Sequence, residues 1–244
     1  MSKGKIGFIG CGNMGTAIVQ SLIQKKIFTA KQIGISEADA KKRSQLKKKL
    51  KVATFTDNKN LVSSSEIILL AVKPQQMKEV LKEISPYLTK QHLILSIAAG
   101  LDTAFFTQHL PPKTRLIRVM PNMGVMIGMG ASGLFASITA KPQDKKIALK
   151  IFTAGGQALF VPREELLDSV TAVSGSGPAF VFLFIESLIQ AGIQDGLTPS
   201  VSRQLVLQTL KGATEMATLS RESLSDLIQK SLLKVGPQKP GLKH

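Results

Sequence analysis

The sequence predicts an α/β protein in which an N-terminal doubly wound sheet is followed by an all-α helical domain. Short apolar runs alternate with helical patterns through the first two thirds of the 244 residues, which is typical of a parallel sheet covered on both faces. Strand signals stop at about residue 163. The charge changes at the same place, because residues 1–164 carry 25 basic and 9 acidic side chains and residues 165–244 carry 7 of each. We therefore predict domains at 1–163 and 164–244.

The expected elements of the first domain alternate along the chain. Each strand is a short apolar run, and each helix has apolar residues at helical spacing. Pro74 suits the first turn of the third helix. We expect strands at residues 5–9, 33–36, 52–55, 67–72, 93–96 and 115–119, and helices at residues 16–23, 39–50 and 74–84.

The expected helices of the second domain are strongly apolar. Residues 178–191 are apolar nearly all the way round, and a later helix places Val206, Leu210, Ala213 and Ala217 on one face. An apolar surface on every side needs cover on every side, which a small helical unit cannot supply alone. We therefore expect a subunit interface here, in a homodimer or a higher homo-oligomer.

Composition argues against several classes of protein. The single Cys11 cannot form an intramolecular disulfide, and three scattered histidines predict no zinc site. The uninterrupted apolar runs are shorter than the roughly 18–20 residues that cross a bilayer, and no signal-like cleavage site follows the N-terminus. We expect a cytoplasmic protein that binds no membrane. The formal charge of +16 suggests nucleic acid as a partner, but one Tyr, no Trp and no recognition motif argue against it.

A glycine-rich loop, G-x-G-x-x-G, stands between the first expected strand and the first helix. Gly10 permits a tight turn, Gly12 lets the backbone approach a pyrophosphate, and Gly15 lets helix and strand pack closely. The positive end of the helix then faces the anion. The pattern alone also fits a plain structural turn. Its place directly after a buried strand, with Ser36 and Glu37 about 20 residues later, favours a dinucleotide site.

The end of the second strand bears on the choice of dinucleotide. Glu37 would accept a hydrogen bond from the ribose 2′-hydroxyl of NADH, whereas Ser36 with Lys41, Lys42 and Arg43 would receive the 2′-phosphate of NADPH. The helix that follows is very basic, and we interpret most of its lysines as a solvated surface. We favour NADPH as the cofactor, with NADH as the alternative.

A second small-residue segment precedes the most apolar helix, with the sequence Ser174-Gly175-Ser176-Gly177-Pro178. Pro178 suits a first helical turn, and hydroxyls beside the free amides of a helix N-terminus would hold a carboxylate. A plain N-cap with glycines for close packing explains the same residues. A serine nucleophile fits less well, because Ser176 lacks a glycine two positions before it and neither central histidine has a partner motif. We interpret the segment as a carboxylate cradle.

Five ordered motifs resemble the pyrroline-5-carboxylate reductase family over roughly residues 4–225. They are GFIGCGNMG at 7–15, AVKPQ at 71–75, SIAAG at 96–100, RVMPN at 118–122 and TAVSGSGPA at 171–179. Gly192, Gly196, Leu197, Gln208 and Thr209 continue the match. The resemblance implies reduction of 1-pyrroline-5-carboxylate to L-proline by NAD(P)H, the last step of proline biosynthesis. It also implies a Rossmann-type domain and a helical dimerisation domain that interlocks with a partner subunit.

The residue patterns and the resemblance together give the expected site. By analogy with lysine-using hydroxyacid dehydrogenases, Lys73 is a candidate catalytic residue. A simpler interpretation is that this lysine attracts the anionic cofactor electrostatically. We therefore assign no catalytic residue and no metal ligand. The expected cofactor-binding residues are Gly10, Gly12, Asn13, Met14, Gly15, Ser36, Asn58, Ala71, Val72, Lys73, Pro74, Ala98 and Gly100. The expected substrate-binding residues are Asn122, Thr171, Ser174, Gly175, Ser176, Gly177 and Pro178.

Two departures from the family pattern leave alternatives open. The family has Asn-Thr-Pro where this chain has Asn122-Met123-Gly124. A Ser-Pro-Gly-Gly-Thr-Thr segment that supplies a substrate-binding hydroxyl is replaced, after about residue 230, by a tail whose prolines and glycines forbid a regular helix through it. We expect a truncated or altered C-terminus there. The alternatives are a catalytically impaired dinucleotide-binding or regulatory homologue, and a related hydroxyacid dehydrogenase that uses Lys73.

Overall fold

The computed structural model describes residues 4–232, which form two compact units that divide after Pro178. The first unit is built on one eight-stranded sheet in the order β3-β2-β1-β4-β5-β6-β7-β8. The predicted domain boundary at 163/164 stays a prediction. It marks the position where the strand pattern of the sequence ends, whereas the first compact unit extends to Pro178. The strands are β1 (Ile6–Ile9), β2 (Ile33–Ser36), β3 (Ala53–Phe55), β4 (Ile67–Leu70), β5 (Leu93–Ser96), β6 (Arg115–Pro121), β7 (Gly130–Ala136) and β8 (Gly156–Phe160).

The sheet is wound in both directions from β1. That strand pairs in parallel with β2 on one side and β4 on the other, so Ile6 lies opposite both Ile33 and Ile67. Such a reversal of strand order is the place where doubly wound folds bind ligands, at the carboxyl ends of the strands. Among the strands of residues 4–232, only β6 and β7 pair antiparallel, and the turn between them includes Gly128 with a φ of 74°. The predicted doubly wound α/β fold is confirmed, with this one antiparallel pair in a mostly parallel sheet.

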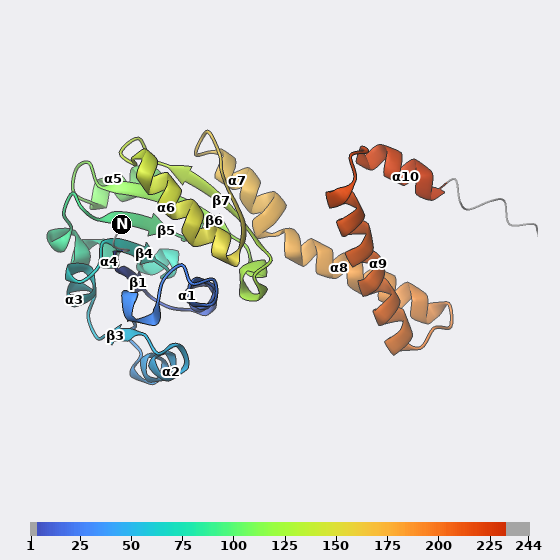
Figure 1. The fold of residues 1–244 in the computed structure, drawn as a ribbon, viewed down its shortest axis with the longest axis horizontal. Helices are drawn as coiled ribbons and strands as arrows, with labels where there is room; N and C mark the ends of the chain where they lie inside the picture. Colours follow the sequence, from blue (N-terminus) through green and yellow to red (C-terminus); the bar gives the residue numbers. More distant parts are fainter. Residues whose placement is uncertain (1–3, 233–244) are drawn as a thin grey trace, which may run out of the picture. The chain divides into compact units, whose positions relative to one another are not determined.

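Helices cover both faces of the sheet (Figure 1). Buried side chains from α1, α2 and α6 pack on one face and those from α3, α4 and α5 on the other. Successive residues of β4 alternate between the two cores, with Ile67 and Leu69 in one and Ile68 and Leu70 in the other. The helices are α1 (Asn13–Gln24), α2 (Ala40–Leu50), α3 (Asn58–Ser63), α4 (Pro74–Ile84), α5 (Thr103–His109), α6 (Pro142–Phe152) and α7 (Leu166–Val170).

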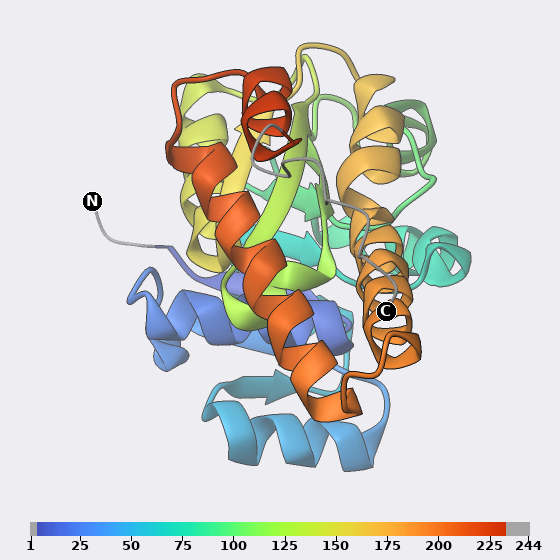
Figure 2. The same cartoon turned by 90° about the vertical axis from the view of Figure 1, so that its right-hand side faces the viewer.

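The sequence patterns missed several elements. They placed no element between residues 119 and 163, where β7, α6 and β8 lie, and they gave no helix at α3 or α5. The β7 strand reads GASGLFA, and its glycines and small side chains hide the strand signal. Both α3 and α5 have fewer than eight residues, which is too short to display a helical period. The edge strand β3, by contrast, was predicted, and it contacts α2 (Figure 2).

The second unit is helical. It contains most of α8 (Gly177–Gln194), followed by α9 (Pro199–Leu219) and α10 (Leu224–Leu232). The prediction of a helix that is apolar on all sides is confirmed, and the single chain leaves Phe180 and Leu183 of α8 each 66% exposed. By length and composition alone, the helical stretch Leu166–Gln194 could cross a membrane. From residue 233 onwards, the altered tail predicted from the sequence lies outside the described residues.

Candidate functional site

The loop after β1 leaves the amino end of α1 open. Gly10 turns the chain with a φ of 75°, and its N–H donates to the Ser36 carbonyl at 2.9 Å. Gly12 is the N-cap of α1 and has no side chain to cap it, and Thr16 N–H makes the bond to the Gly12 carbonyl at 2.9 Å. The amides of the first helical turn therefore have no acceptor within the helix. Together with the helix dipole they form a site for an anion.

The three loop glycines have different surroundings. A Cβ on Gly10 would lie 2.7 Å from Val72 Cγ1, and one on Gly15 would lie 3.4 Å from Ala71 Cβ, so these two glycines allow the loop and helix to pack against the end of β4. A Cβ on Gly12 would meet no atom within 4 Å. Open space therefore lies directly over the backbone of Gly12, which is what a pyrophosphate that touches this backbone requires.

A cavity of about 420 Å³ opens beside this loop, at the carboxyl ends of β1, β2 and β4. Its size lies within the range of small-molecule and cofactor sites. The structure brings together seven of the predicted cofactor residues in its wall. They are Gly10, Gly12, Ser36, Asn58, Ala71, Val72 and Lys73.

The other predicted cofactor residues lie around this cavity without lining it. Asn13 lines an adjoining hollow of about 300 Å³ that shares Gly12 and Lys42 with the first. Met14 and Gly15 belong to the first turn of α1, and Pro74 is the first residue of α4. Ala98 and Gly100 lie in the turn after β5, where Ala98 N–H donates to Ser96 Oγ at 3.3 Å and Gly100 has a φ of 74°.

Charged side chains order the end of β2. Glu37 Oε2 lies 2.5 Å from Lys42 Nζ, and the Arg43 guanidinium donates to the carbonyl oxygens of Glu37 at 2.7 Å and Ala38 at 3.2 Å. The Lys42 N–H bond to Asp39 lowers the pKa of that carboxyl. The Glu37 carboxylate and Lys42, which the sequence weighed as alternative ribose partners, are therefore bound to one another. Arg43 holds the loop rather than reaching freely into the cavity.

Several wall residues were not predicted from the sequence. Glu83 accepts from Asn58 Nδ2 at 2.7 Å and so fixes the orientation of that predicted residue. Asp57 caps α3, and the bond from Asn60 N–H lowers the pKa of its carboxyl. Cys11 is buried, which raises the pKa of its thiol. A capping Asp before a short helix could have been read from the sequence, whereas the Glu83 contact joins residues 25 apart and left no local signal.

The predicted substrate residues gather around the end of β6. Asn122 follows the strand, and its Nδ2 donates to Ser174 Oγ at 3.3 Å across 52 residues. Its Oδ1 accepts from the N–H groups of Gly124 at 3.1 Å and Ala131 at 3.0 Å, which fixes the amide. A Cβ on Gly175 would lie 2.7 Å from Met120 Cε, so the segment packs closely on β6 at this glycine.

The backbone of the predicted cradle differs from the expectation. The sequence predicts a loop before a helix N-terminus, but Thr171–Gly175 is a π-helical turn that continues α7 into α8. Ser176 N–H donates to the Thr171 carbonyl at 2.8 Å, five residues back. The wider π turn accommodates Pro178, which lacks an N–H, without ending the helix. A free set of amides is therefore absent here, and the segment offers hydroxyl groups instead.

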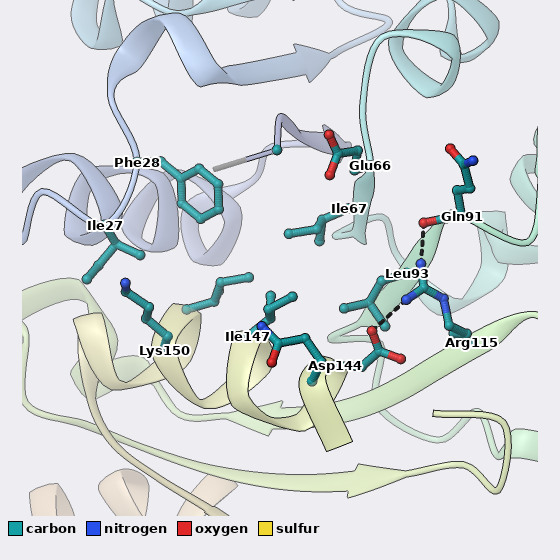
Figure 3. A pocket seen from close by; sticks show the side chains of 13 residues that line it. Ile27, Phe28, Glu66, Ile67, Gln91, Leu93, Arg115, Asp144, Ile147 and Lys150 are labelled. Atoms are coloured by element: carbon teal, nitrogen blue, oxygen red, sulfur yellow. Dashed lines mark hydrogen bonds and ion pairs between the residues drawn. The ribbon is translucent and has the colours of Figure 1, made fainter. Parts of the chain in front are cut away.

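A second cavity, of about 340 Å³, lies at the opposite end of the sheet (Figure 3). Its wall includes Leu93 and Arg115, the first residues of β5 and β6, and the ion pair between Arg115 NH1 and Asp144 Oδ1 at 2.7 Å. Arg115 also donates to the Gln91 carbonyl. This cavity contains none of the predicted site residues. Because doubly wound sheets bind dinucleotides at the carboxyl ends of their strands, the cavity beside Gly12 is the better candidate.

Comparison with family models covers both parts of the chain. A model described as "NADP oxidoreductase coenzyme F420-dependent" matches residues 5–100. A model described as "Pyrroline-5-carboxylate reductase dimerisation" matches residues 164–244. The first match contains the glycine loop and the cavity described above, and the second contains the π-helical turn and the apolar helices.

Curated relatives and solved structures agree with these matches. A pyrroline-5-carboxylate reductase of Methanosarcina acetivorans is 41% identical over 217 residues, which is 89% of this chain and 80% of the relative. One of Pseudomonas aeruginosa is 35% identical over 93% of this chain and 83% of the relative. The solved reductase of Coxiella burnetii superposes with a TM-score of 0.88 at 35% identity, over 96% of this chain and 86% of that one. A Plasmodium falciparum pyrroline carboxylate reductase with NADP bound has a TM-score of 0.85 at 33% identity, over 97% and 86%. The open glycine loop, the Asn122–Ser174 contact and these similarities place the chain in the pyrroline-5-carboxylate reductase family.

Proposed function

We propose that this protein reduces 1-pyrroline-5-carboxylate to L-proline with NADPH. The observation that carries the proposal is the uncapped amino end of α1 at Gly12, which opens into a cavity of about 420 Å³ at the carboxyl ends of the strands. The wall of that cavity contains seven of the residues predicted to bind the cofactor. The family relation described above supplies the substrate.

The residues present fit a dinucleotide. The unpaired amides of the first turn of α1 would hold the pyrophosphate, and Gly12 leaves room for it against the backbone. Lys73 lines the same cavity and adds positive charge near an anionic ligand, whereas the charge of Lys42 is paired with Glu37. When bound, the reduced nicotinamide supplies the hydride. Ala71, Val72, Ala98 and Gly100 belong to the turns after β4 and β5, which we propose hold the nicotinamide end.

The substrate side needs orientation more than proton transfer. A cyclic imine that binds in its protonated form requires only a hydride at carbon, so positioning and electrostatics carry most of the rate. Burial raises the pKa of the single thiol, Cys11, which favours its neutral form. His92 is buried against the Val62 carbonyl, and His109 lies against the Phe105 carbonyl. Neither of these two histidines, which are the ones within the described residues, lines the candidate cavity.

We propose that the π-helical turn and Asn122 hold the imino acid. Ser174 Oγ is fixed by the Asn122 amide, and Ser176 is exposed and offers a second hydroxyl. Hydroxyl groups of this kind bind a carboxylate by charge-assisted hydrogen bonds. The proposed substrate residues are Asn122, Thr171, Ser174, Gly175, Ser176, Gly177 and Pro178.

NADPH is the preferred cofactor in this proposal. The Glu37 carboxylate, which would repel a 2′-phosphate, is paired with Lys42. Lys41 and Lys42 begin α2 directly after this loop, and the Plasmodium relative is described with NADP bound. A ratio of kcat/KM for NADPH over NADH well above one would support the preference, and a ratio below one would reverse it.

We also propose that the protein is a cytoplasmic homo-oligomer, joined through its helical unit. Phe180, Phe182 and Phe184 of α8 are each more than half exposed in the single chain, and an exposed apolar surface of this kind marks an interface. The dimerisation model that matches residues 164–244 supports a second copy of the chain as the cover. Because such a cover buries the apolar helix, we assign the helix to a subunit interface rather than to a membrane.

The direct test follows NADPH oxidation by absorbance with purified chain and 1-pyrroline-5-carboxylate. We expect turnover that saturates with the imino acid and yields L-proline. Cofactor binding without turnover would instead select the non-catalytic homologue. Turnover with a 2-hydroxy acid and NADP⁺, but none with the imine, would select the hydroxyacid dehydrogenase.

A further inference from the structure

One face of β6 holds the predicted substrate segment in place. Arg118 and Met120 alternate along β6 and so point to the same side of the sheet, and Asn122 follows directly after the strand. Each contacts the segment around α7. Arg118 NH1 donates to Glu164 Oε1 at 2.6 Å, Met120 Cε packs where Gly175 lacks a side chain, and Asn122 binds Ser174.

Glu164 also connects β6 to a third segment, the start of α5. Its Oε1 accepts three hydrogen bonds, from Arg118 NH1 at 2.6 Å, from Thr103 N–H at 2.7 Å and from Thr103 Oγ1 at 2.6 Å. Thr103 is the first residue of α5 and closely follows the turn that contains Ala98 and Gly100. One carboxylate oxygen therefore ties the turn on the cofactor side to β6 and to the start of α7.

The contact between Arg118 and Glu164 joins two charged side chains that are largely shielded from solvent. The Arg118 side chain is 11% exposed and that of Glu164 is 22% exposed. A cation this deeply buried needs an anion, and bonds to charged groups are stronger and shorter than neutral ones. A small shift of either segment would lengthen bonds to the same oxygen. The two segments are therefore held at one separation.

We propose that Glu164 is a positioning residue for hydride transfer, which fixes the substrate turn Thr171–Gly175 relative to the cofactor turn at Ala98 and Gly100. The inference rests on the proposed function. Its reason is that hydride transfer depends steeply on geometry, since a misplacement of about 1 Å costs roughly 100-fold in rate. Glu164 touches neither ligand in this account and acts through Thr103 and Arg118.

The test compares Glu164→Gln with Glu165→Gln, which removes the same charge from the adjacent residue. Glu165 is exposed and makes no side-chain cap bond. For Glu164→Gln we expect kcat to fall about 10- to 100-fold, with a smaller change in the KM for the imino acid. The primary isotope effect on kcat, measured with NADPH that carries deuterium at both C4 positions, should rise because hydride transfer becomes more rate-limiting. The Glu165→Gln variant should match the unchanged chain in both measurements.

A second variant separates positioning from stability. Glu164→Gln leaves Arg118 buried without its anion, so the double variant Arg118→Gln, Glu164→Gln removes both charges and restores a neutral pair. A folded variant, single or double, that keeps the kcat and isotope effect of the unchanged chain would overturn the inference. If such a variant differs from the unchanged chain only in a lowered melting temperature, the role of Glu164 is structural. If the unchanged chain shows no turnover, the proposed function itself is wrong, and this inference is wrong with it.

Discussion

Gly12→Ala separates cofactor binding from folding more cleanly than any other change in the glycine loop. Gly12 has a φ of −70°, which alanine adopts without strain, and the new Cβ would meet no atom within 4 Å. The cost to the free energy of unfolding should therefore stay below about 1 kcal/mol, as for a change of helix N-cap. The new methyl group stands where the pyrophosphate would meet the backbone. It should displace the anion from at least one charge-assisted hydrogen bond, each worth roughly 1.5–3 kcal/mol.

That loss corresponds to an increase of about 10- to 100-fold in the Kd for NADPH. The assay is calorimetric or fluorescence titration of NADPH, with thermal unfolding of the same preparation. Gly10→Ala is the matched control, because its φ of 75° and the approach of Val72 Cγ1 at 2.7 Å predict that it destabilises the fold itself. An unchanged Kd in a folded Gly12→Ala protein would show that the pyrophosphate does not lie over this loop.

Four further predictions follow from particular side chains. Asp144→Ala removes a carboxylate that is 1% exposed and paired with Arg115 at 2.7 Å, so denaturant unfolding should show a loss of about 3–5 kcal/mol; a loss within experimental error would contradict the ion pair. Ser176→Ala should raise the substrate KM or lower kcat by about tenfold while leaving NADPH binding alone, and unchanged kinetics would remove Ser176 from the site. Phe182→Glu should shift the oligomer to smaller species in sedimentation, whereas an unaltered oligomer would exclude α8 from the interface. Burial raises the pKa of the Cys11 thiol, so the neutral thiol contributes stability that is present below the unfolded pKa and is lost as pH rises through the folded pKa. Alkylation of the native thiol at pH 8 should be much slower than in denaturant, and equal rates would refute its burial.

The elements that could be predicted are those in which the apolar side chains repeat with the period of the strand or helix itself. Strands such as Ile67–Leu70 are apolar on both faces, so their sequence alone indicates a sheet with two covered faces. The chain between residues 119 and 163 was not predictable in the same way. The β7 strand carries Gly130 and Gly133, and Gly133 faces Val170 so closely that a Cβ would lie 2.7 Å from it. That glycine serves packing against α7, which no local pattern reveals.

The candidate site divides along similar lines. The glycine loop was predictable because its residues are consecutive and its backbone chemistry is local. The Asn122–Ser174 and Thr103–Glu164 contacts join residues 52 and 61 apart, so only the folded chain brings them together. The segment Ser174–Pro178 was predicted as a loop because its serines, glycines and proline favour turns. In the structure, packing of Gly175 on Met120 and the π-helical geometry override that local preference.

The central claim is that this chain transfers a hydride from NADPH to a cyclic imino acid held near Asn122 and Ser174. The measurement that tests it most directly is single-turnover reduction of 1-pyrroline-5-carboxylate with stoichiometric NADPH that carries deuterium at both C4 positions, followed by identification of the product. The account predicts L-proline that carries one deuterium at C5. No proline, or proline without the label, from a chain that binds NADPH would contradict it.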